Sequence, residues 1–302
     1  MRIYVFGAEG QVARSLREAA STSPEVVIGC GARPGVDILQ PDLIERALAE
    51  FAPDLVINPA AYTAVDRAES EPELAFATNR DGAGNVAKGA QKLDIPIIHL
   101  STDYVFDGRK QTPYVETDAV GPRSIYGRSK LEGERAVASS NSHHIILRTA
   151  WVYAPFGGNF VRTILRLTSE RDRLRIVDDQ IGCPTYAPDI ADAILAIAAK
   201  IKSAGWQDHF AGVTHLAGLD EVTWCEFARR IVATAKKKGR RNVLVDAIKT
   251  VEYPTPAERP ANSRLRCERL AELFDVRLPP LSSSLEKCLE RLLDGNLQEG
   301  KA

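Results

Sequence analysis

The chain has 302 residues, of which 44% are hydrophobic and 26% charged, and its formal net charge is −1. This length can bury a large core in one large domain or two smaller ones. The near-neutral charge gives no reason to expect nucleic acid or an anionic membrane as a partner, and no apolar run is long enough to span a bilayer.

The first half of the chain alternates short apolar runs with amphipathic segments. Strands are predicted at 3–6, 26–29, 55–57, 95–100 and 145–147, and helices from 12 to 20 and at 42–51, 72–93 and 124–139. Strands that are apolar throughout and separated by helices are typical of a parallel sheet covered on both faces. The pattern predicts a doubly wound α/β fold of the Rossmann type, whose ligand crevice lies at the carboxyl ends of the strands.

The rhythm changes after about residue 152. Helices are predicted at 159–171, 189–201, 224–237 and 285–293, and short strands at 174–177 and 214–216. We interpret this half as one helix–strand excursion back to the main sheet plus a smaller, mostly helical substrate domain. The expected division is a dinucleotide-binding domain at 1–150, to which 185–218 returns, and a substrate-binding domain at 151–184 and 219–302.

The five cysteines are scattered and odd in number, without a Cys-x-x-Cys pair: Cys30, Cys183, Cys225, Cys267 and Cys288. This spacing argues against a disulfide framework or a zinc site and favours a reducing compartment. Because residues 2–6 already have the pattern of a buried strand, no signal peptide is expected. We therefore expect a cytoplasmic location.

A glycine motif stands between the first predicted strand and the first helix. Residues 7–13 match G-x-x-G-x-x-A, in which Gly7 permits the turn, Gly10 lets the backbone approach a pyrophosphate, and Ala13 allows close packing. The helix N-terminus supplies free N–H groups for the phosphates. The strand–turn–helix context favours a dinucleotide site over a glycine-rich turn without a ligand.

The second predicted strand ends without the acidic residue that usually holds the ribose of NAD. Arg33 follows it and can face a 2′-phosphate, which favours NADPH as cofactor and leaves NADH possible. The alternative is that Arg33 is an ordinary surface residue. Asp37, slightly further on, can contact the adenosine.

Tyr126 and Lys130 form a Y-x-x-x-K motif, which places both side chains on one face of a helix. A neighbouring ammonium lowers the pKa of a phenol, and the tyrosine can then donate a proton to a carbonyl oxygen. Lys130 can also hold the nicotinamide ribose. By itself this motif is common by chance.

Thr102 follows the fourth predicted strand at its carboxyl end. A hydroxyl there can hydrogen-bond a substrate carbonyl and polarise it, whereas the alternative is a helix cap or a turn. The glycine loop, this hydroxyl and the Tyr/Lys helix, in that order along the chain, together predict a nicotinamide-dependent reductase.

These motifs resemble the extended short-chain dehydrogenase/reductase superfamily and, within it, the dTDP-4-dehydrorhamnose reductase family. The resemblance covers nearly the whole chain. It depends on residues 7–13, 58–66, 68–72, 100–108, 114–118, 126–132, 148–153, 178–185 and 253–263.

The resemblance implies that Thr102, Tyr126 and Lys130 form the catalytic triad. With the glycine loop and Arg33 included, the expected cofactor-binding residues are Gly7, Gly10, Gln11, Val12, Arg33, Asp37, Ile38, Ala60, Ala61, Tyr62, Thr63, Tyr126 and Lys130. The expected substrate-binding residues are Val65, Thr102, Asp103, Tyr104 and Trp151. An aromatic face such as that of Trp151 packs well on a deoxysugar ring, although a core tryptophan is the alternative.

The implied activity is NAD(P)H-dependent reduction of the C4 keto group of dTDP-4-dehydro-L-rhamnose. The alternatives are a 4-ketoreductase of another nucleotide-linked deoxysugar and a non-catalytic, reductase-like regulatory subunit. Some members of the family form a magnesium-bridged dimer through glutamates at positions that are here Ser15 and Pro188. We therefore expect no metal, and a monomer or a homodimer without a metal bridge.

Overall fold

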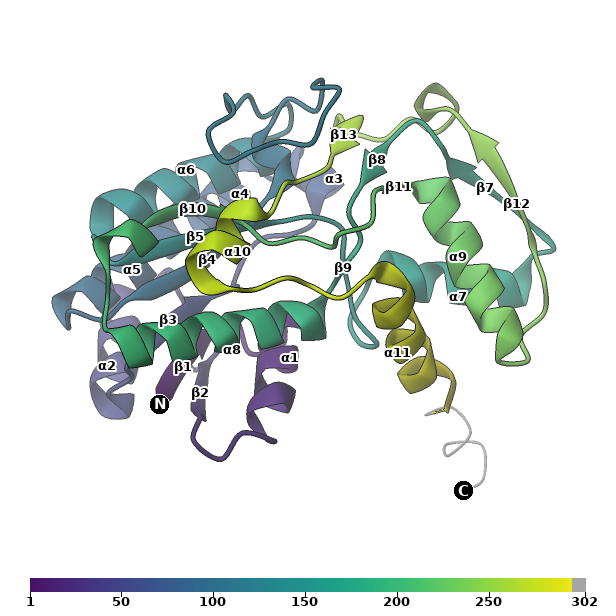
Figure 1. Ribbon diagram of the computed structural model, residues 1–302. Coiled ribbons are helices and arrows are strands. Elements are labelled where there is room, and N and C mark those ends of the chain that lie inside the picture. Colours follow the sequence, from purple (N-terminus) through teal and green to yellow (C-terminus); the bar gives the residue numbers. More distant parts are fainter. Residues whose placement is uncertain (295–302) are drawn as a thin grey trace.

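The computed structural model describes residues 1–294, and its centre is a six-stranded sheet in the order β10-β5-β4-β3-β1-β2 (Figure 1). Every neighbouring pair in this sheet is parallel. The strands are β1 (Arg2–Phe6), β2 (Val27–Gly31), β3 (Leu55–Asn58), β4 (Ile97–Thr102), β5 (His144–Thr149) and β10 (Gly212–His215). The central strands β3 and β4 are buried along their whole length, which explains their uninterrupted apolar sequences.

Helices cover both faces of the sheet. In Figure 1, α6 (Ile125–Ser140) lies above it, and α1 (Gln11–Ala20) and α8 (Ala187–Ala204) lie below it. On the side of α6, α2 (Pro41–Phe51) packs on α5 (Ala83–Lys92), and α5 packs on α6. The predicted doubly wound α/β fold is confirmed.

The second half of the chain adds a smaller lobe with its own hydrophobic core, on the right of Figure 1. Its helices are α7 (Phe160–Glu170), α9 (Trp224–Lys237) and α11 (Leu281–Asp294). Its strands form pairs or triplets: β7 (Arg173–Val177) with β12 (Leu244–Ile248), β6 (Val152–Tyr153) with β9 (Thr185–Tyr186), and β11 (Val222–Thr223), β8 (Ile181–Gly182) and β13 (Asn262–Ser263) together.

The predicted helix at 72–93 is interrupted. It consists of α4 (Pro72–Phe76), a π-helical stretch (Ala77–Gly82) and α5. A Cβ atom on Gly133 of α6 would lie 2.1 Å from the carbonyl oxygen of Asn79, so α6 and the π-helical stretch are in backbone contact. The extra residue of the wider turn brings the buried Asn79 side chain to Ser129, whose Oγ accepts a hydrogen bond from it at 2.9 Å.

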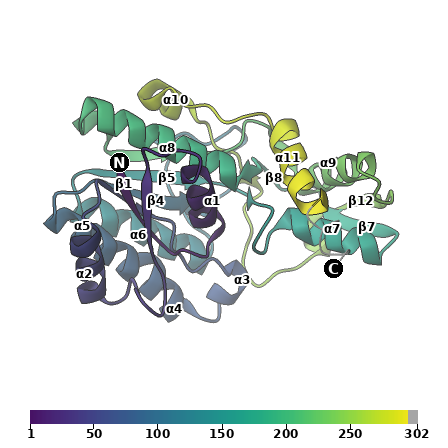
Figure 2. The same cartoon turned by 90° about the horizontal axis from the view of Figure 1, so that it is seen from below.

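Several short elements were not predicted from the sequence. They are α3 (Val65–Ala68), α10 (Glu268–Phe274), β12, and the 3₁₀ turns at Asp103–Val105, Asp208–Phe210 and Thr250–Glu252. The helix α10 lies beside α8 (Figure 2) and packs on α8 and β10. Its Phe274 ring lies 5.1 Å from that of Phe210 in the core of the main sheet. This segment therefore joins the larger core, although the expected division assigned it to the substrate domain. Residues 295–302 of that expected domain lie outside the described residues, and the division as a whole stays a prediction.

Among residues 1–294, none of the helices combines the length and the apolar character that crossing a membrane would require.

Candidate active site

A cleft of about 860 Å³ runs along the carboxyl ends of the sheet strands and reaches the smaller lobe. It brings together nearly all of the predicted site residues. Those that line it are Gly7, Gly10, Gln11, Val12, Arg33, Asp37, Ile38, Ala60, Ala61, Thr63, Val65, Thr102, Asp103, Tyr104, Tyr126, Lys130 and Trp151.

Tyr62 is the exception. Its hydroxyl donates to Glu71 at 2.6 Å, and its backbone N–H donates to the Asn79 side chain at 2.8 Å. These bonds direct the ring toward α4 while the neighbouring residues face the cleft. A sequence motif read as a continuous run cannot distinguish a residue whose side chain turns away.

The glycine loop forms one wall of the cleft. Gly7 has a φ of +83°, and a Cβ atom there would lie 3.0 Å from Ala60, so this position requires glycine. Gly10 is the N-cap residue of α1 and has no side chain to satisfy the free N–H groups of the first helical turn. These groups and the helix dipole make the wall suited to a pyrophosphate. Gln11 is held from the smaller lobe by Asn159, whose Nδ2 donates to its Oε1 at 3.0 Å.

Beyond β2, the cleft is lined by Arg33, Asp37 and Ile38. Arg33 is exposed, whereas one carboxylate oxygen of Asp37 already accepts the backbone N–H of Leu39 at 2.9 Å. Cys30, at the position where an acid would hold a ribose, is exposed as a free thiol. This end of the cleft thus presents a guanidinium group that is free to meet an anion.

The reacting side of the cleft is formed by β4 and α6. Ser124 caps α6 by accepting the backbone N–H of Gly127 at 3.1 Å, and Tyr126 and Lys130 project from the first turns toward the strand end. Gly127 allows this approach, because a Cβ there would lie 2.2 Å from the carbonyl oxygen of Tyr104. The Tyr104 and Tyr126 rings meet edge to face at 5.4 Å.

Lys130 is only 2% exposed. Its Nζ donates to the carbonyl oxygen of Leu100 at 2.6 Å and lies 3.4 Å from Nε2 of the buried His99. Burial lowers the pKa of Lys130 to about 8, and the Glu134 carboxylate one turn further along α6 opposes this shift. Burial also holds the pKa of His99 well below its ordinary value, so His99 is neutral.

A buried ion pair between Arg148 of β5 and Glu134 of α6 lies next to these residues. Arg148 donates to the Glu134 carboxylate through Nε at 2.9 Å and through Nη2 at 2.7 Å. The Ser101 hydroxyl donates to the same carboxylate at 2.5 Å. The two charged side chains are 4% and 5% exposed. A bidentate pair of this kind fixes the orientation of its partners, here the strand end and the catalytic helix.

The expectation for Tyr126 was wrong in one respect. Desolvation raises the pKa of Tyr126 above its ordinary value, and the lowering cause is the Thr102 hydroxyl rather than Lys130. Lys130, whose ammonium donates to the Leu100 carbonyl, is not among the groups that shift the Tyr126 pKa. Tyr126 is therefore protonated at neutral pH and can act as a proton donor.

Thr102 and Asp103 line the cleft at the carboxyl end of β4. The Thr102 hydroxyl donates to Oδ1 of Asp103 at 3.0 Å and accepts the backbone N–H of Tyr104 at 3.2 Å. Within the described residues, Oδ2 of Asp103 has no hydrogen-bond partner, and burial raises the pKa of Asp103 to about 6. An unpartnered buried oxygen beside the reacting groups is suited to a ligand hydroxyl.

Trp151 lies on the side of the cleft that the smaller lobe forms. It has a φ of +48°, and its ring stacks on Trp224 of α9 at 3.5 Å with an interplanar angle of 10°. Gly182 lies directly against the indole, since a Cβ there would be 2.4 Å from it. Trp151 is half-buried, lines the cleft and also packs against the core of the smaller lobe.

Sequence reasoning missed several lining residues, among them Trp224, Asn159, Thr149 and Arg259. Trp224 begins a helix far along the chain and reaches the cleft only by stacking on Trp151, so no local motif could reveal it. Arg259 lies in residues 253–263, one of the segments on which the family resemblance depends. That resemblance could have identified it as a site residue.

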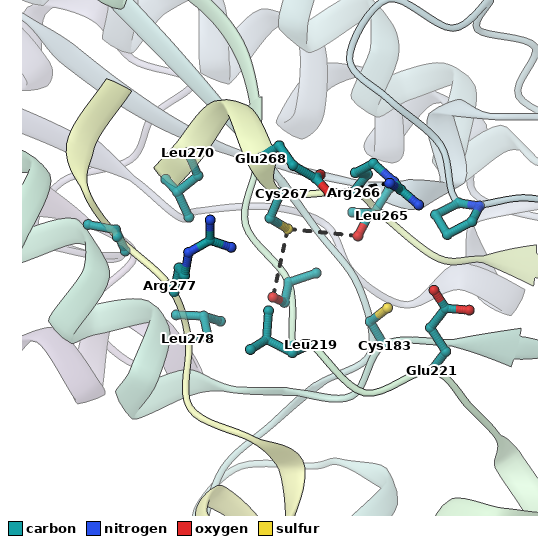
Figure 3. Close-up of a pocket in the computed structure, with 14 residues that line it drawn as sticks. Cys183, Leu219, Glu221, Leu265, Arg266, Cys267, Glu268, Leu270, Arg277 and Leu278 are labelled. Carbon is teal, nitrogen blue, oxygen red and sulfur yellow. Dashed lines mark hydrogen bonds and ion pairs between the residues drawn. The ribbon is translucent and has the colours of Figure 1, made fainter. Parts of the chain in front are cut away.

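A second, smaller cavity of about 160 Å³ lies apart from the predicted site residues and is lined by Cys183, Cys267 and Arg277 among others (Figure 3). The Cys267 thiol donates to the carbonyl oxygens of Ala217 and Leu265, each at 3.8 Å. Burial raises the pKa of both cysteines to about 12, so both thiols stay protonated and unreactive.

The fold and the constellation of side chains in the main cleft are those of the extended short-chain dehydrogenase/reductases. The family model described as "RmlD substrate binding domain" matches residues 1–293. The chain belongs to this family, that of the dTDP-4-dehydrorhamnose reductases.

Individual relatives agree along the full length. A dTDP-4-dehydrorhamnose reductase from Sinorhizobium fredii is 48% identical over 301 residues, covering 100% of this chain and 99% of that protein. The crystal structure of such a reductase from Clostridium acetobutylicum has a TM-score of 0.88 at 34% identity, with 97% of this chain and 99% of that chain covered. The structure of the Bacillus anthracis reductase in complex with NADP has a TM-score of 0.87 at 33% identity, with 95% and 98% covered.

Proposed function

We propose that this protein reduces the C4 keto group of dTDP-4-dehydro-L-rhamnose to give dTDP-L-rhamnose, with NADPH as the hydride donor. The observation that carries the proposal is the meeting of Thr102, Tyr126 and Lys130 in one cleft, between a dinucleotide-type glycine loop and an aromatic wall. The names of the full-length relatives support the choice of this sugar nucleotide over another keto substrate.

The residues present fit a bound dinucleotide. The glycine loop has no Cβ atoms where a pyrophosphate would approach, and the exposed Arg33 suits a 2′-phosphate at the far end. When bound, NADPH supplies the hydride that reaches C4 of the sugar. Gly7, Gly10, Gln11 and Val12 would hold its pyrophosphate, and Lys130 its nicotinamide ribose.

The chain itself supplies polarisation and the proton. With substrate bound, the Thr102 hydroxyl would turn from Asp103 to donate to the keto oxygen and draw electron density from C4. As negative charge develops on that oxygen, Tyr126 transfers its phenolic proton to it. Lys130, one helical turn away, would position the nicotinamide ribose beside the phenol.

Asp103 and Trp151 orient the sugar. The free Oδ2 of Asp103 accepts a sugar hydroxyl, and the edge of the Trp151 indole, whose ring is held by Trp224 and Gly182, contacts the deoxysugar. With Tyr104 and Val65, they hold the keto group against Thr102 and Tyr126, which lowers the entropic cost of reaction.

The experiment is a steady-state assay of NADPH and NADH oxidation with dTDP-4-dehydrorhamnose, followed by NMR of the product. The Tyr126→Phe variant should lose at least about 100-fold in kcat, because it lacks the general acid, while its affinity for NADP⁺ stays unchanged. Wild-type turnover in this variant would refute the catalytic assignment. No oxidation by the wild type would indicate a regulatory subunit, and an epimeric product would indicate a different 4-ketoreductase.

We further propose a reducing, cytoplasmic compartment and a monomer or homodimer without a bridging metal. All five cysteines are free, and Ser15 is 1% exposed with its hydroxyl donating to the Gln11 carbonyl at 2.8 Å. In that position Ser15 has no group to offer a shared cation. Sedimentation with and without EDTA tests the oligomeric state.

A further inference from the structure

The substrate side of the cleft contains a cation to which the catalytic steps assign no role. Arg259 lines the cleft beside residues expected to bind the sugar nucleotide. Its Nη2 donates to Oδ2 of Asp66, the residue after Val65, at 2.7 Å.

The negative charge of a sugar nucleotide is best met by a cationic side chain in the cleft. A nucleoside diphosphate sugar carries a dianionic diphosphate, for which cationic side chains are the favoured partners. Among the described residues, the Lys and Arg side chains that line the cleft are Arg33, Lys130 and Arg259. Arg33 lies at the adenosine end and Lys130 is committed to the Leu100 carbonyl, so Arg259 is the cation available to the substrate.

The segment that carries Arg259 is firmly held. The backbone N–H of Ala257 donates to Oδ1 of Asp66 at 3.3 Å, and Glu258 forms a two-bonded ion pair with Arg123, both bonds at 3.0 Å. On the far side, Asn262 donates to the backbone carbonyls of Lys110 and Thr112. These contacts tie residues 257–262 to the larger lobe across the mouth of the cleft.

This attachment leaves Arg259 suited to bind a phosphate. Asp66 accepts a hydrogen bond from one guanidinium nitrogen, which orients the group and leaves its other donors free. The paired side chains remain 31% and 37% exposed, so the pair is open to a ligand. A planar, oriented guanidinium can bind a phosphate through two parallel hydrogen bonds.

We propose that Arg259, oriented by Asp66, binds the diphosphate of the sugar nucleotide and thereby positions the sugar at Thr102 and Tyr126. The inference rests on the proposed function for the class of substrate. It adds an anion subsite that is separate from the dinucleotide phosphate site at the glycine loop.

The test compares binding of dTDP with binding of thymidine, which lacks the phosphates, by calorimetry and by quenching of tryptophan fluorescence. Arg259→Gln should weaken dTDP binding roughly 10- to 100-fold, the usual effect of losing a charge-assisted hydrogen bond, and leave thymidine binding unchanged. Arg259→Lys keeps the charge without the fork and should recover part of the affinity.

Arg123→Gln is the matched control. It removes another cation bonded to the same segment, but Arg123 does not line the cleft, so dTDP binding should stay at the wild-type level. NADP⁺ binding should be unchanged in all variants, which verifies that the fold is intact.

Three results would overturn the proposal: wild-type protein that binds no dTDP, unchanged dTDP binding in Arg259→Gln, or equal weakening of dTDP and thymidine. The last would assign Arg259 to holding the segment alone. Failure of the proposed function has a different signature, namely tight dTDP binding without any oxidation of NADPH in the presence of the keto-sugar.

Discussion

Lys130 is a residue whose ionisation should be visible in the kinetics. Because burial lowers its pKa to about 8, the ammonium is lost as the pH rises through that value. We expect kcat/KM for NADPH to be constant near neutrality and to fall above about pH 8, since a neutral lysine is a weaker hydrogen-bond donor to the nicotinamide ribose than an ammonium.

A pH–rate profile measures this directly. The Lys130→Met variant should be slow at all pH values and lack the alkaline limb, because it has no ammonium to lose. A wild-type profile that stays flat up to the pKa of an ordinary lysine, about 10.4, would contradict the expectation.

For the residues of the site, the sequence predicted which side chains meet but not how the pKa of Tyr126 shifts. The types and spacing of Tyr126, Lys130 and Thr102 predicted that they would share a site, because i and i+4 lie on one helix face and strand ends meet the crevice. The direction of the Tyr126 pKa shift was not predictable. It depends on how completely the phenol is buried and on its contacts with Thr102 and Asp103, which are set by packing.

At the scale of elements, the contact between α6 and the π-helical stretch at Ala77–Gly82 positions the catalytic helix. Gly133→Ala would place a methyl group 2.1 Å from the Asn79 carbonyl oxygen, which the backbone cannot accept without a shift. We expect the free energy of unfolding to fall by about 1–3 kcal/mol, the usual cost of overpacking, and kcat to fall as Tyr126 moves.

Gly158→Ala provides the control, because a Cβ atom there meets nothing within 4 Å. Its stability should stay within about 0.5 kcal/mol of the wild type. Chemical denaturation measures both variants, and equal stability for the two would show that α6 does not depend on this close approach.

At the scale of the whole molecule, the C-terminal helix α11 supports the substrate side. Leu289 is fully buried in the core of the smaller lobe, where α11 packs on α9, the helix that carries Trp224. Leu289→Ala should cost about 2–5 kcal/mol in stability. It should also raise KM for the sugar nucleotide, since Trp224 supports Trp151, while NADP⁺ binding changes little.

Leu244→Ala in the same lobe is the matched control, because that side chain is 55% exposed and should contribute little. Thermal unfolding and separate binding measurements for the two ligands distinguish the effects. An equal loss of affinity for NADP⁺ and for the sugar nucleotide would refute separate support of the two sides of the cleft.

The sequence by itself determined the sheet, the glycine loop and the catalytic helix, because each depends on local periodicity and on short-range backbone geometry. Only the tertiary structure placed Trp224 against Trp151, attached α10 to the larger core and brought Arg259 to Asp66, a partner 193 residues away in sequence. Such contacts join segments that share no local pattern, so they depend on how the whole chain packs.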